Sequence, residues 1–326
     1  MHRDAFVTGG TGFVGLNLVQ RLVAEGWDVT ALHRASSDLR YLGRLRARRA
    51  AGDVTDAAAV RAALPKACDT VFHVAGNTNL WRRRNAEQTR DNVEGTRNVV
   101  EACIAKGVRR LVVTSSISAY GPVSGAVTED TPSRAATSWI NYQKTKWEAQ
   151  EIARAATARG LEVVILQPGA IIGPYDVGTW SRLFLMVRDG TLPGVPPSGR
   201  TFAHVHEVAA AHIAAADRGE SGSHYILGGE NASMLDLVQE IARLLGRPAP
   251  ARETPAFVVK AAAAFGDLVS RVTGREPALT PEMAAGFGGT VTATAAKAQR
   301  DLGFRVVPLK VMVRDCFDWM VAQGRL

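Results

Sequence analysis

A tyrosine and a lysine lie four residues apart in the segment NYQKTK, residues 141–146. On a helix, residues at this spacing share one face, so the phenol of Tyr142 and the ammonium of Lys146 could act on one bound molecule. A free tyrosine, with a pKa of about 10, is a poor acid–base catalyst at neutral pH, but a neighbouring cation lowers that pKa. The pair could therefore transfer a proton, although an ordinary exposed helix would also give this spacing.

A glycine cluster lies in the segment FVTGGTGFVG, residues 6–15, with the spacing Gly9, Gly12, Gly15. Glycine inside a helix or strand costs roughly 0.5–1 kcal/mol relative to alanine, so this cluster indicates a special backbone geometry. Residues 5–7 are typical of a buried strand, and the apolar residues after the cluster recur at helical spacing. Such a strand-to-helix turn leaves free amide groups at the helix start, which can bind a pyrophosphate. An ordinary tight turn is the alternative.

These two motifs lie within a regular alternation of strand-like and helical patterns. Alternation of this kind predicts an α/β fold, a Rossmann-type, doubly wound parallel sheet with crossover helices. The predicted strands are residues 5–7, 28–33, 49–53, 70–74, 110–114 and 162–166, and the predicted helices are residues 12–25, 56–64, 87–106 and 140–159.

The pattern changes after Pro168. Glycine and proline become frequent between residues 169 and 199, followed by shorter helices, an alanine-rich stretch and a basic, proline-punctuated segment at 275–281. We therefore predict a nucleotide-binding domain over residues 1–167 and a smaller, mostly helical substrate-binding domain over residues 168–326. Segments near residues 200–216 are expected to return to the first domain.

Composition limits the class of protein. The chain has 326 residues, 46% of them apolar, and no apolar run reaches the roughly 18 residues that a membrane span needs. The first strand starts within a few residues of Met1, which leaves no room for a signal peptide, so a cytoplasmic location is expected. The three cysteines, Cys68, Cys103 and Cys316, lie far apart without metal-ligand spacing and are expected to be buried thiols.

The formal net charge is +8, with basic clusters at residues 40–49 and 82–84. Nucleic-acid binding is not favoured, because aromatic residues amount to only 6% and do not interleave with the basic ones. The charge instead suits a solvated surface that attracts anionic cofactors. Residues 82–84 could reach an anionic substrate, but a solvated helix start is the preferred interpretation.

Six motifs together resemble those of the extended short-chain dehydrogenase/reductases. This family holds nucleotide-sugar epimerases and dehydratases, dihydroflavonol reductases and 3β-hydroxysteroid dehydrogenases. The motifs are TGGTGFVG (8–15), GDVTD (52–56), VFHVAGNT (71–78), DNVEGTRNVV (91–100), LQPGAIIGP (166–174) and FAHVHEVA (202–209). The resemblance covers nearly the whole chain and is most specific in its first half.

The resemblance implies a catalytic set of Ser116, Tyr142 and Lys146, supported by Asn92. Tyr142 would exchange a proton with the substrate oxygen, and Ser116 would donate a hydrogen bond to that oxygen. Lys146 would lower the pKa of the tyrosine and hold the nicotinamide ribose. The motif TSSISAYG favours Ser116 over Ser115, although either hydroxyl could simply cap the strand end. The cofactor-binding residues implied by the same motifs are Gly9, Gly12, Phe13, Val14, Gly15, His33, Arg34, Asp53, Val54, Val74, Ala75, Gly76, Tyr142, Lys146, Pro168 and Ile171.

The end of the second strand bears on the choice of cofactor. Proteins that bind NAD usually place a carboxylate there, about 20 residues after the glycine turn, to accept a hydrogen bond from the ribose. This chain has His33 and Arg34, followed by two serines, which suits the 2′-phosphate of NADP. We therefore expect NADP, with NAD left open, because Arg34 could also be a surface residue that stacks on the adenine.

The substrate class depends on one arginine. In nucleotide-sugar members of the family, two arginines of the second domain hold the diphosphate, and Arg200 matches the first of them. The second would fall within residues 280–293, which contain no basic residue. Residues 254–280 resemble the apolar segment of the reductase and steroid-dehydrogenase branches.

The expected function is an NADP-dependent carbonyl reductase or alcohol dehydrogenase that acts on a hydrophobic ketone or alcohol. The alternatives are a nucleotide-sugar 4-epimerase or dehydratase, and a non-catalytic scaffold that senses NADP.

His204 and His206 resemble a metal-binding pair. They lie two residues apart with no third ligand nearby in the sequence, so packing and hydrogen-bonding roles are expected and no metal is predicted. The expected partner is a small-molecule substrate, and a homodimer is left open.

Overall fold

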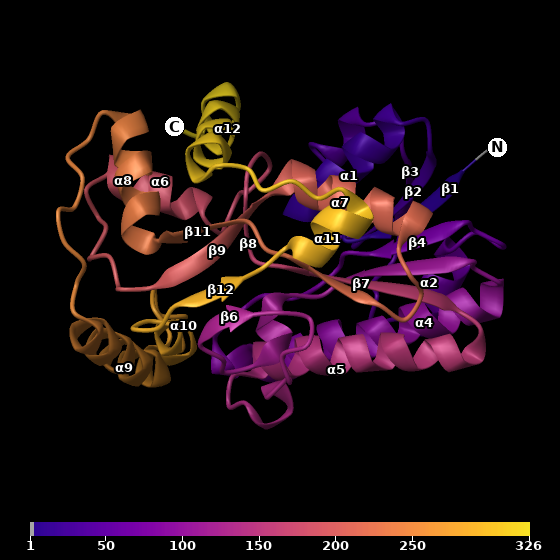
Figure 1. Ribbon diagram of the computed structural model, residues 1–326, viewed down its shortest axis with the longest axis horizontal. Coiled ribbons are helices and arrows are strands. Elements are labelled where there is room, and N and C mark those ends of the chain that lie inside the picture. The colour runs from indigo at the N-terminus through magenta and orange to yellow at the C-terminus, as the bar shows by residue number, and fades with distance from the viewer. Residues whose placement is uncertain (1–2) are drawn as a thin grey trace.

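The computed structural model describes residues 3–326, and its centre is a sheet of seven parallel strands (Figure 1). The strands are β1 (Asp4–Thr8), β2 (Asp28–His33), β3 (Arg48–Ala51), β4 (Thr70–His73), β5 (Arg110–Thr114), β7 (Glu162–Pro168) and β10 (His224–Leu227). Their order is β10-β7-β5-β4-β1-β2-β3. The predicted α/β class with a doubly wound parallel sheet is confirmed.

Helices cover both faces of this sheet, because its strands are apolar on both sides. One face carries α1 (Phe13–Ala24), α7 (Val205–Arg218) and α11 (Ala296–Leu302), and the other carries α2 (Ala57–Ala63), α4 (Gly95–Lys106) and α5 (Asn141–Ala155) (Figure 1). The strand order reverses between β1 and β4. In open parallel sheets, ligands bind at the carboxyl ends of the strands beside this reversal.

A smaller lobe lies beyond those strand ends. It contains the sheet β11-β9-β8, formed by β8 (Ala170–Ile172), β9 (Gly199–His204) and β11 (Glu230–Ser233). Strands β6 (Gly125–Val127) and β12 (Val291–Ala293) pair with each other. Its helices are α6 (Ser181–Arg188), α8 (Met234–Leu245), α9 (Ala256–Thr273), α10 (Pro281–Ala285) and α12 (Leu309–Ala322).

The central sheet and its helices differ from the sequence prediction mainly in three places. The third strand ends at Ala51 rather than at residue 53, and β10 was not predicted. The predicted helix 87–106 is divided into α3 (Asn85–Thr89), a π-helical turn (Arg90–Glu94) and α4. The π-helical turn changes which way the intervening side chains point, and such turns are frequent at functional sites.

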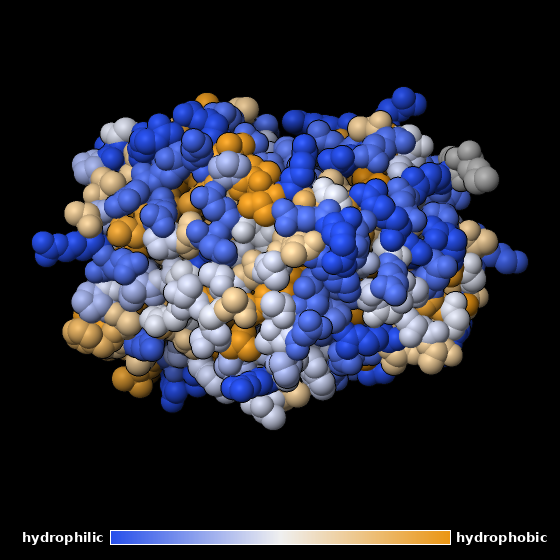
Figure 2. All heavy atoms as spheres, viewed as in Figure 1, coloured by the Kyte–Doolittle hydropathy of each residue, from blue (hydrophilic) through white to orange (hydrophobic). Residues whose placement is uncertain are grey.

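Helix α9 departs from the usual pattern of a surface helix, which buries apolar residues and exposes polar ones. Its buried face holds Asp267 and Ser270 besides Val259 and Ala263, whereas its exposed face is apolar. Phe257, Phe265 and Val272 are 74%, 69% and 87% exposed. Apolar surface accordingly gathers at the end of the molecule that α9 forms (Figure 2). Within residues 3–326, no helix combines the length and apolar character that crossing a membrane would require.

The three cysteines are buried and unpaired, as predicted. Burial raises the pKa of Cys68 to about 12, so its thiol stays protonated at neutral pH. We assign no chemistry to these thiols.

Candidate active site

The glycine turn between β1 and α1 has the geometry of a pyrophosphate cradle. Gly9 adopts a left-handed φ of 70°, and a Cβ atom there would lie 2.7 Å from the backbone nitrogen of Ala75. A Cβ on Gly15 would overlap the carbonyl oxygen of Gly9. Gly12 is the N-cap of α1 and supplies no side chain to its amides. The predicted turn therefore leaves the start of a helix open to phosphate oxygens, which fits a dinucleotide. Phe13 and Val14 follow as the first residues of α1.

At the adenine end of the predicted cofactor site, β2 ends in His33 and Arg34 follows, so neither of these two positions supplies a carboxylate. His33 ends β2 and its Nδ1 lies 3.0 Å from the carbonyl oxygen of Arg34. The guanidinium of Arg34 is exposed and forms no hydrogen bond or ion pair with the residues described. Asp53 accepts hydrogen bonds from the amide and hydroxyl of Thr55, and Val54 packs against Gly95.

The hydroxyl groups of Ser116 and Tyr142 meet at the carboxyl edge of the sheet. Ser116 caps the short 3₁₀ turn Ile117–Tyr120 after β5, and Tyr142 lies in the first turn of α5. Burial raises the pKa of Tyr142, and a hydrogen bond with Ser116 lowers it in part. Ser115 instead donates to Gln150, 3.1 Å away in the core. The structure thus brings Ser116, and not Ser115, to the tyrosine.

Lys146 lies one helical turn after Tyr142 but does not act on it directly. Its Nζ donates to the carbonyl oxygen of Thr114 at 3.0 Å, and a Cβ on Gly76 would lie 3.1 Å from that nitrogen. Burial lowers the pKa of Lys146 from 10.5 to about 8. The lowering of the Tyr142 pKa expected from a neighbouring cation does not appear: burial raises that pKa, and the group that lowers it in part is Ser116 and not Lys146.

Asn92 lies in the π-helical turn, and both polar atoms of its side chain form hydrogen bonds that connect parts of the site. Its Oδ1 accepts from the amide of Asn77 at 2.7 Å, and its Nδ2 donates to the carbonyl of Asn77 at 3.0 Å and the hydroxyl of Thr145 at 3.1 Å. These bonds tie the loop after β4, which contains Val74, Ala75 and Gly76, to α5. Asn92 is therefore a positioning residue.

His73 is a site residue that the sequence analysis missed. Its Nδ1 lies 2.8 Å from the Thr8 hydroxyl and its Nε2 lies 3.0 Å from the Thr96 hydroxyl. Burial lowers its pKa to about 3, with a smaller contribution from Lys146, so the ring is neutral. A cavity of about 10 Å³ between His73 and Lys146 could hold one water. The only signal in the sequence was a histidine at the end of an apolar strand.

Burial of Lys146 predicts a pH-dependent stability difference. Below pH 8 the lysine is charged in both the folded and the unfolded chain, so the folded state carries the desolvation cost. Between pH 8 and 10.5 the unfolded chain binds more protons, so wild-type stability should rise by up to about 3 kcal/mol relative to Lys146→Met. Chemical unfolding of both proteins across this pH range measures the difference, and parallel stability curves would contradict the prediction.

The predicted substrate residue Arg200 lies in β9, and its side chain is half-buried with the Nε enclosed. Burial lowers its pKa, its Nε has no hydrogen-bond partner, and among residues 3–326 no ion pair with a carboxylate is seen. A Cβ on Gly286 would lie 3.3 Å from its Nη2, which places it beside the end of α10. Pro168 ends β7 and Ile171 lies in β8, next to β9.

The basic run 82–84 is exposed at the start of a helical segment, as expected, and two of its residues also contact the second lobe. Arg82 Nε lies 3.1 Å from Glu282 of α10 and 4.0 Å from Asp267 of α9. Arg83 donates to the carbonyl of Ser270 at 3.5 Å. The loop after β4 is thereby linked to the helices that face it.

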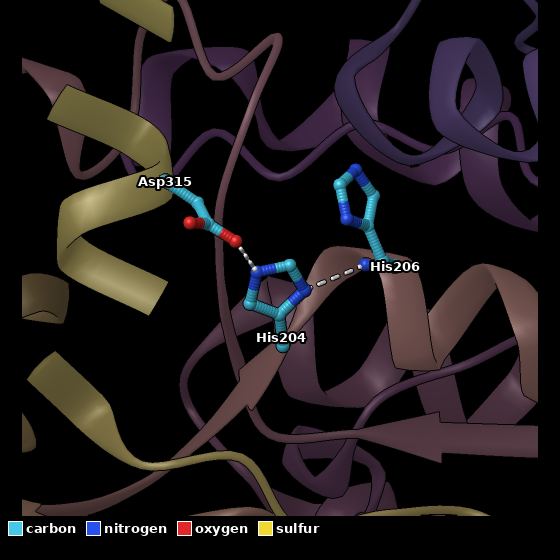
Figure 3. Close-up of side chains that lie close together, drawn as sticks. All are labelled: His204, His206 and Asp315. Atoms are coloured by element: carbon cyan, nitrogen blue, oxygen red, sulfur yellow. Dashed lines mark hydrogen bonds and ion pairs between the residues drawn. The ribbon is translucent and has the colours of Figure 1, made fainter. Parts of the chain in front are cut away.

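His204 and His206 come together with Asp315, a third group that the sequence did not indicate (Figure 3). His204 Nδ1 accepts from the amide of His206 at 3.0 Å and so caps α7, which leaves the ring proton on Nε2. Nε2 lies 2.9 Å from Asp315 on α12. A metal on Nε2 would move the proton to Nδ1 and break the cap. The geometry therefore favours packing and capping roles.

Comparisons with known proteins agree with this arrangement. A sequence model of the NAD dependent epimerase/dehydratase family matches residues 5–228. A 2-alkyl-3-oxoalkanoate reductase of Stenotrophomonas maltophilia is 31% identical, over 91% of this chain and 93% of the relative. A 3-beta-hydroxysteroid dehydrogenase of Mycolicibacterium neoaurum is 28% identical, over 98% and 93%. The structure of MoeE5 in complex with UDP-glucose and NAD is 28% identical, with a TM-score of 0.78 over 98% of this chain and 99% of that one. The protein is therefore an oxidoreductase that belongs to the NAD dependent epimerase/dehydratase family.

Proposed function

We propose that the protein is an NADP-dependent carbonyl reductase, or in reverse an alcohol dehydrogenase, which acts on a hydrophobic ketone or alcohol. The observation that carries this proposal is the contact between the Ser116 and Tyr142 hydroxyls, at the sheet edge that also holds the glycine turn. A hydroxyl pair of this kind can donate to a carbonyl oxygen. Retention of the pair with Lys146 argues against a non-catalytic scaffold.

The chain's own residues would stabilise the negative charge that develops on the substrate oxygen and would supply its proton. When bound, the nicotinamide supplies hydride to the carbonyl carbon, or takes it from the alcohol carbon. Ser116 would donate a hydrogen bond to the oxygen as negative charge develops on it. Tyr142 would then give its phenolic proton to that oxygen and recover one from solvent. The raised pKa of Tyr142 suits a donor, because the phenol stays protonated at neutral pH.

The choice of NADP over NAD rests on Arg34. Its exposed, unpartnered guanidinium is free to pair with a 2′-phosphate, and His33 stands where a ribose-binding carboxylate would be expected. The MoeE5 structure holds NAD. The proposal for this chain therefore depends on its own residues at the end of β2.

Two relatives support an apolar ketone or alcohol as the substrate class. By their names, one reduces 2-alkyl-3-oxoalkanoates and the other oxidises 3-beta-hydroxysteroids. Both names describe carbon skeletons without a nucleotide. Arg200 would contact a polar group of such a substrate, since its Nε has no other partner.

Consumption of NADPH with a panel of hydrophobic ketones tests the proposal, with a UDP-sugar interconversion assay run beside it. A reductase consumes its cofactor in proportion to product, whereas an epimerase regenerates it. Steady NADPH loss with at least one ketone is expected. Interconversion of a UDP-sugar without net loss would establish the nucleotide-sugar alternative, which Arg200 and the UDP-glucose complex of MoeE5 keep open.

Binding of UDP gives a second, independent measurement. If Arg200 is only half of a diphosphate clamp, UDP at millimolar concentration should leave the melting temperature unchanged, since a ligand without useful affinity shifts no folding equilibrium. NADPH serves as the positive control for the assay. A clear stabilisation by UDP would favour the epimerase.

A further inference from the structure

His73 ends β4, and its imidazole ring lies within a continuous series of buried hydrogen bonds. Its Nδ1 lies 2.8 Å from the hydroxyl of Thr8, the last residue of β1, and its Nε2 lies 3.0 Å from the hydroxyl of Thr96 in α4. The Thr8 oxygen also accepts from the amide of Ala75 at 3.2 Å. The Thr96 hydroxyl donates to the carbonyl oxygen of Asn92 at 2.6 Å. The ring therefore connects two separate segments of the candidate site.

The positions of the protons in this series follow from its Asn92 end. A carbonyl oxygen has no proton to give, so the single proton of the Thr96 hydroxyl lies toward Asn92. The Thr96 oxygen then accepts from the histidine, which places the ring proton on Nε2. Because His73 is neutral, its Nδ1 carries no proton and accepts from the hydroxyl of Thr8. Each of the two hydroxyl groups thus donates one hydrogen bond and accepts one.

One end of the series holds the loop after β4 against the glycine turn. Thr8 directly precedes Gly9, and the backbone of Ala75 lies so close to Gly9 that a Cβ atom there would come within 2.7 Å of the Ala75 nitrogen. The hydrogen bond from Ala75 to Thr8 fixes this close approach. Both segments belong to the proposed cofactor site.

The other end of the series reaches the helix that carries Tyr142. Thr96 binds the backbone carbonyl of Asn92 in the π-helical turn, and the Asn92 side chain donates to the hydroxyl of Thr145. Thr145 donates in turn to the carbonyl oxygen of Tyr142 at 3.1 Å. The His73 ring accordingly lies between the loop that would contact the cofactor and the residue that would donate the proton.

We propose that His73 is a positioning residue, whose neutral Nε2–H tautomer sets the loop after β4 and the π-helical turn in their places on either side of it. The residues before it in β4, Val71 and Phe72, are fully buried and apolar. An apolar side chain at position 73 would continue this pattern but could form neither hydrogen bond. The inference rests on the proposed function, which assigns the cofactor and the proton donor to these two segments.

Two amide substitutions separate the two ends of the ring. An asparagine amide reaches about as far as Nδ1 and can accept from Thr8, whereas a glutamine amide reaches about as far as Nε2 and can donate to Thr96. His73→Asn releases only the π-helical turn, so kcat should fall about tenfold while the affinity for NADPH stays within about twofold. His73→Gln releases only the loop after β4, so the affinity for NADPH should fall about tenfold and kcat should change less.

The same two substitutions at His224 are the matched controls. His224 lies in β10 at the edge of the sheet, and its Nε2 lies 3.1 Å from the carbonyl oxygen of Glu129, outside the site. They should lower stability without separating the affinity for NADPH from kcat. If His73→Asn and His73→Gln lose both quantities equally, or if neither loses any, the positioning role is overturned.

Nitrogen NMR of the wild-type protein with ¹⁵N-labelled histidine measures the tautomer without cofactor or substrate. The His73 signals, assigned through its backbone, should show a proton on Nε2 and none on Nδ1. A proton on Nδ1 would overturn the proposal, whether or not the variants fold. If no ketone is reduced, the reductase proposal fails, but NADPH affinities measured by calorimetry still test His73. A weaker affinity in His73→Gln than in His73→Asn supports the positioning role, and equal affinities overturn it.

Discussion

Replacing Tyr142 with phenylalanine is expected to lower turnover about 10²–10⁴-fold, the usual contribution of a positioned acid or base. The substitution removes only the phenolic oxygen, which donates the proton in the proposed reaction, and keeps the ring that packs at the start of α5. The melting temperature and the affinity for NADPH should stay near those of the wild type. Steady-state kinetics with the best ketone of the panel measures the change.

Tyr225→Phe is the matched control for this experiment. The Tyr225 hydroxyl accepts from the amide of Glu220 at 3.2 Å in the core, away from the site, so its loss should affect stability without changing turnover. Turnover close to that of the wild type in Tyr142→Phe would assign the proton transfer to another group. Because burial raises the pKa of Tyr142, the reduction rate of the wild type should decline only on the alkaline side.

The second large effect concerns the cofactor. Arg34→Ala should lower kcat/KM for NADPH about 10- to 150-fold more than for NADH, which corresponds to losing one charge-assisted contact of about 1.5–3 kcal/mol. Only NADPH has a 2′-phosphate to pair with the guanidinium. High ionic strength should reduce the difference, because Arg34 is exposed. The ratio of the two kcat/KM values, measured at low and high salt, tests the prediction.

His33→Asp should change the same ratio further, since it adds a ribose acceptor and repels the phosphate. Arg46→Ala is the control, because Arg46 is an exposed arginine of the same basic run with no described partner. If the wild type already prefers NADH, or if Arg34→Ala leaves the ratio unchanged, the NADP assignment is wrong. That result would not affect the assignment of the glycine turn to cofactor binding, because the pyrophosphate that the turn is proposed to bind is common to both cofactors.

The sequence predicted those parts of the fold that local patterns encode. Long apolar runs and the glycine turn gave most strands of the central sheet, and the spacing of Tyr142 and Lys146 gave the helix that carries them. Length alone does not decide this, since β3 and β4 have four residues each and were predicted, whereas β8 and β10 were not. Strands β8 and β10 form beside neighbouring strands whose hydrogen bonds only the folded chain provides.

The electrostatics of the site could not be predicted from motifs. The direction of the Tyr142 pKa depends on how completely the fold removes water from the phenol. The ion pair between Glu282 and Arg82 joins residues 200 positions apart, so no local pattern indicates it. Properties of this kind belong to tertiary contacts and not to local sequence.

Strand β10 has a consequence for anyone who wishes to divide or recombine this enzyme. The central sheet is completed by residues that follow the first passage through the second lobe, and the family match likewise ends at residue 228. A fragment ending at Pro168 would leave the edge of β7 unpaired and remove α7 from beside α1. Unpaired sheet edges recruit other chains, so such a fragment should be prone to aggregation. A chimera that borrows the nucleotide-binding half must therefore transplant two separate stretches of the chain, with residues 205–227 as the second.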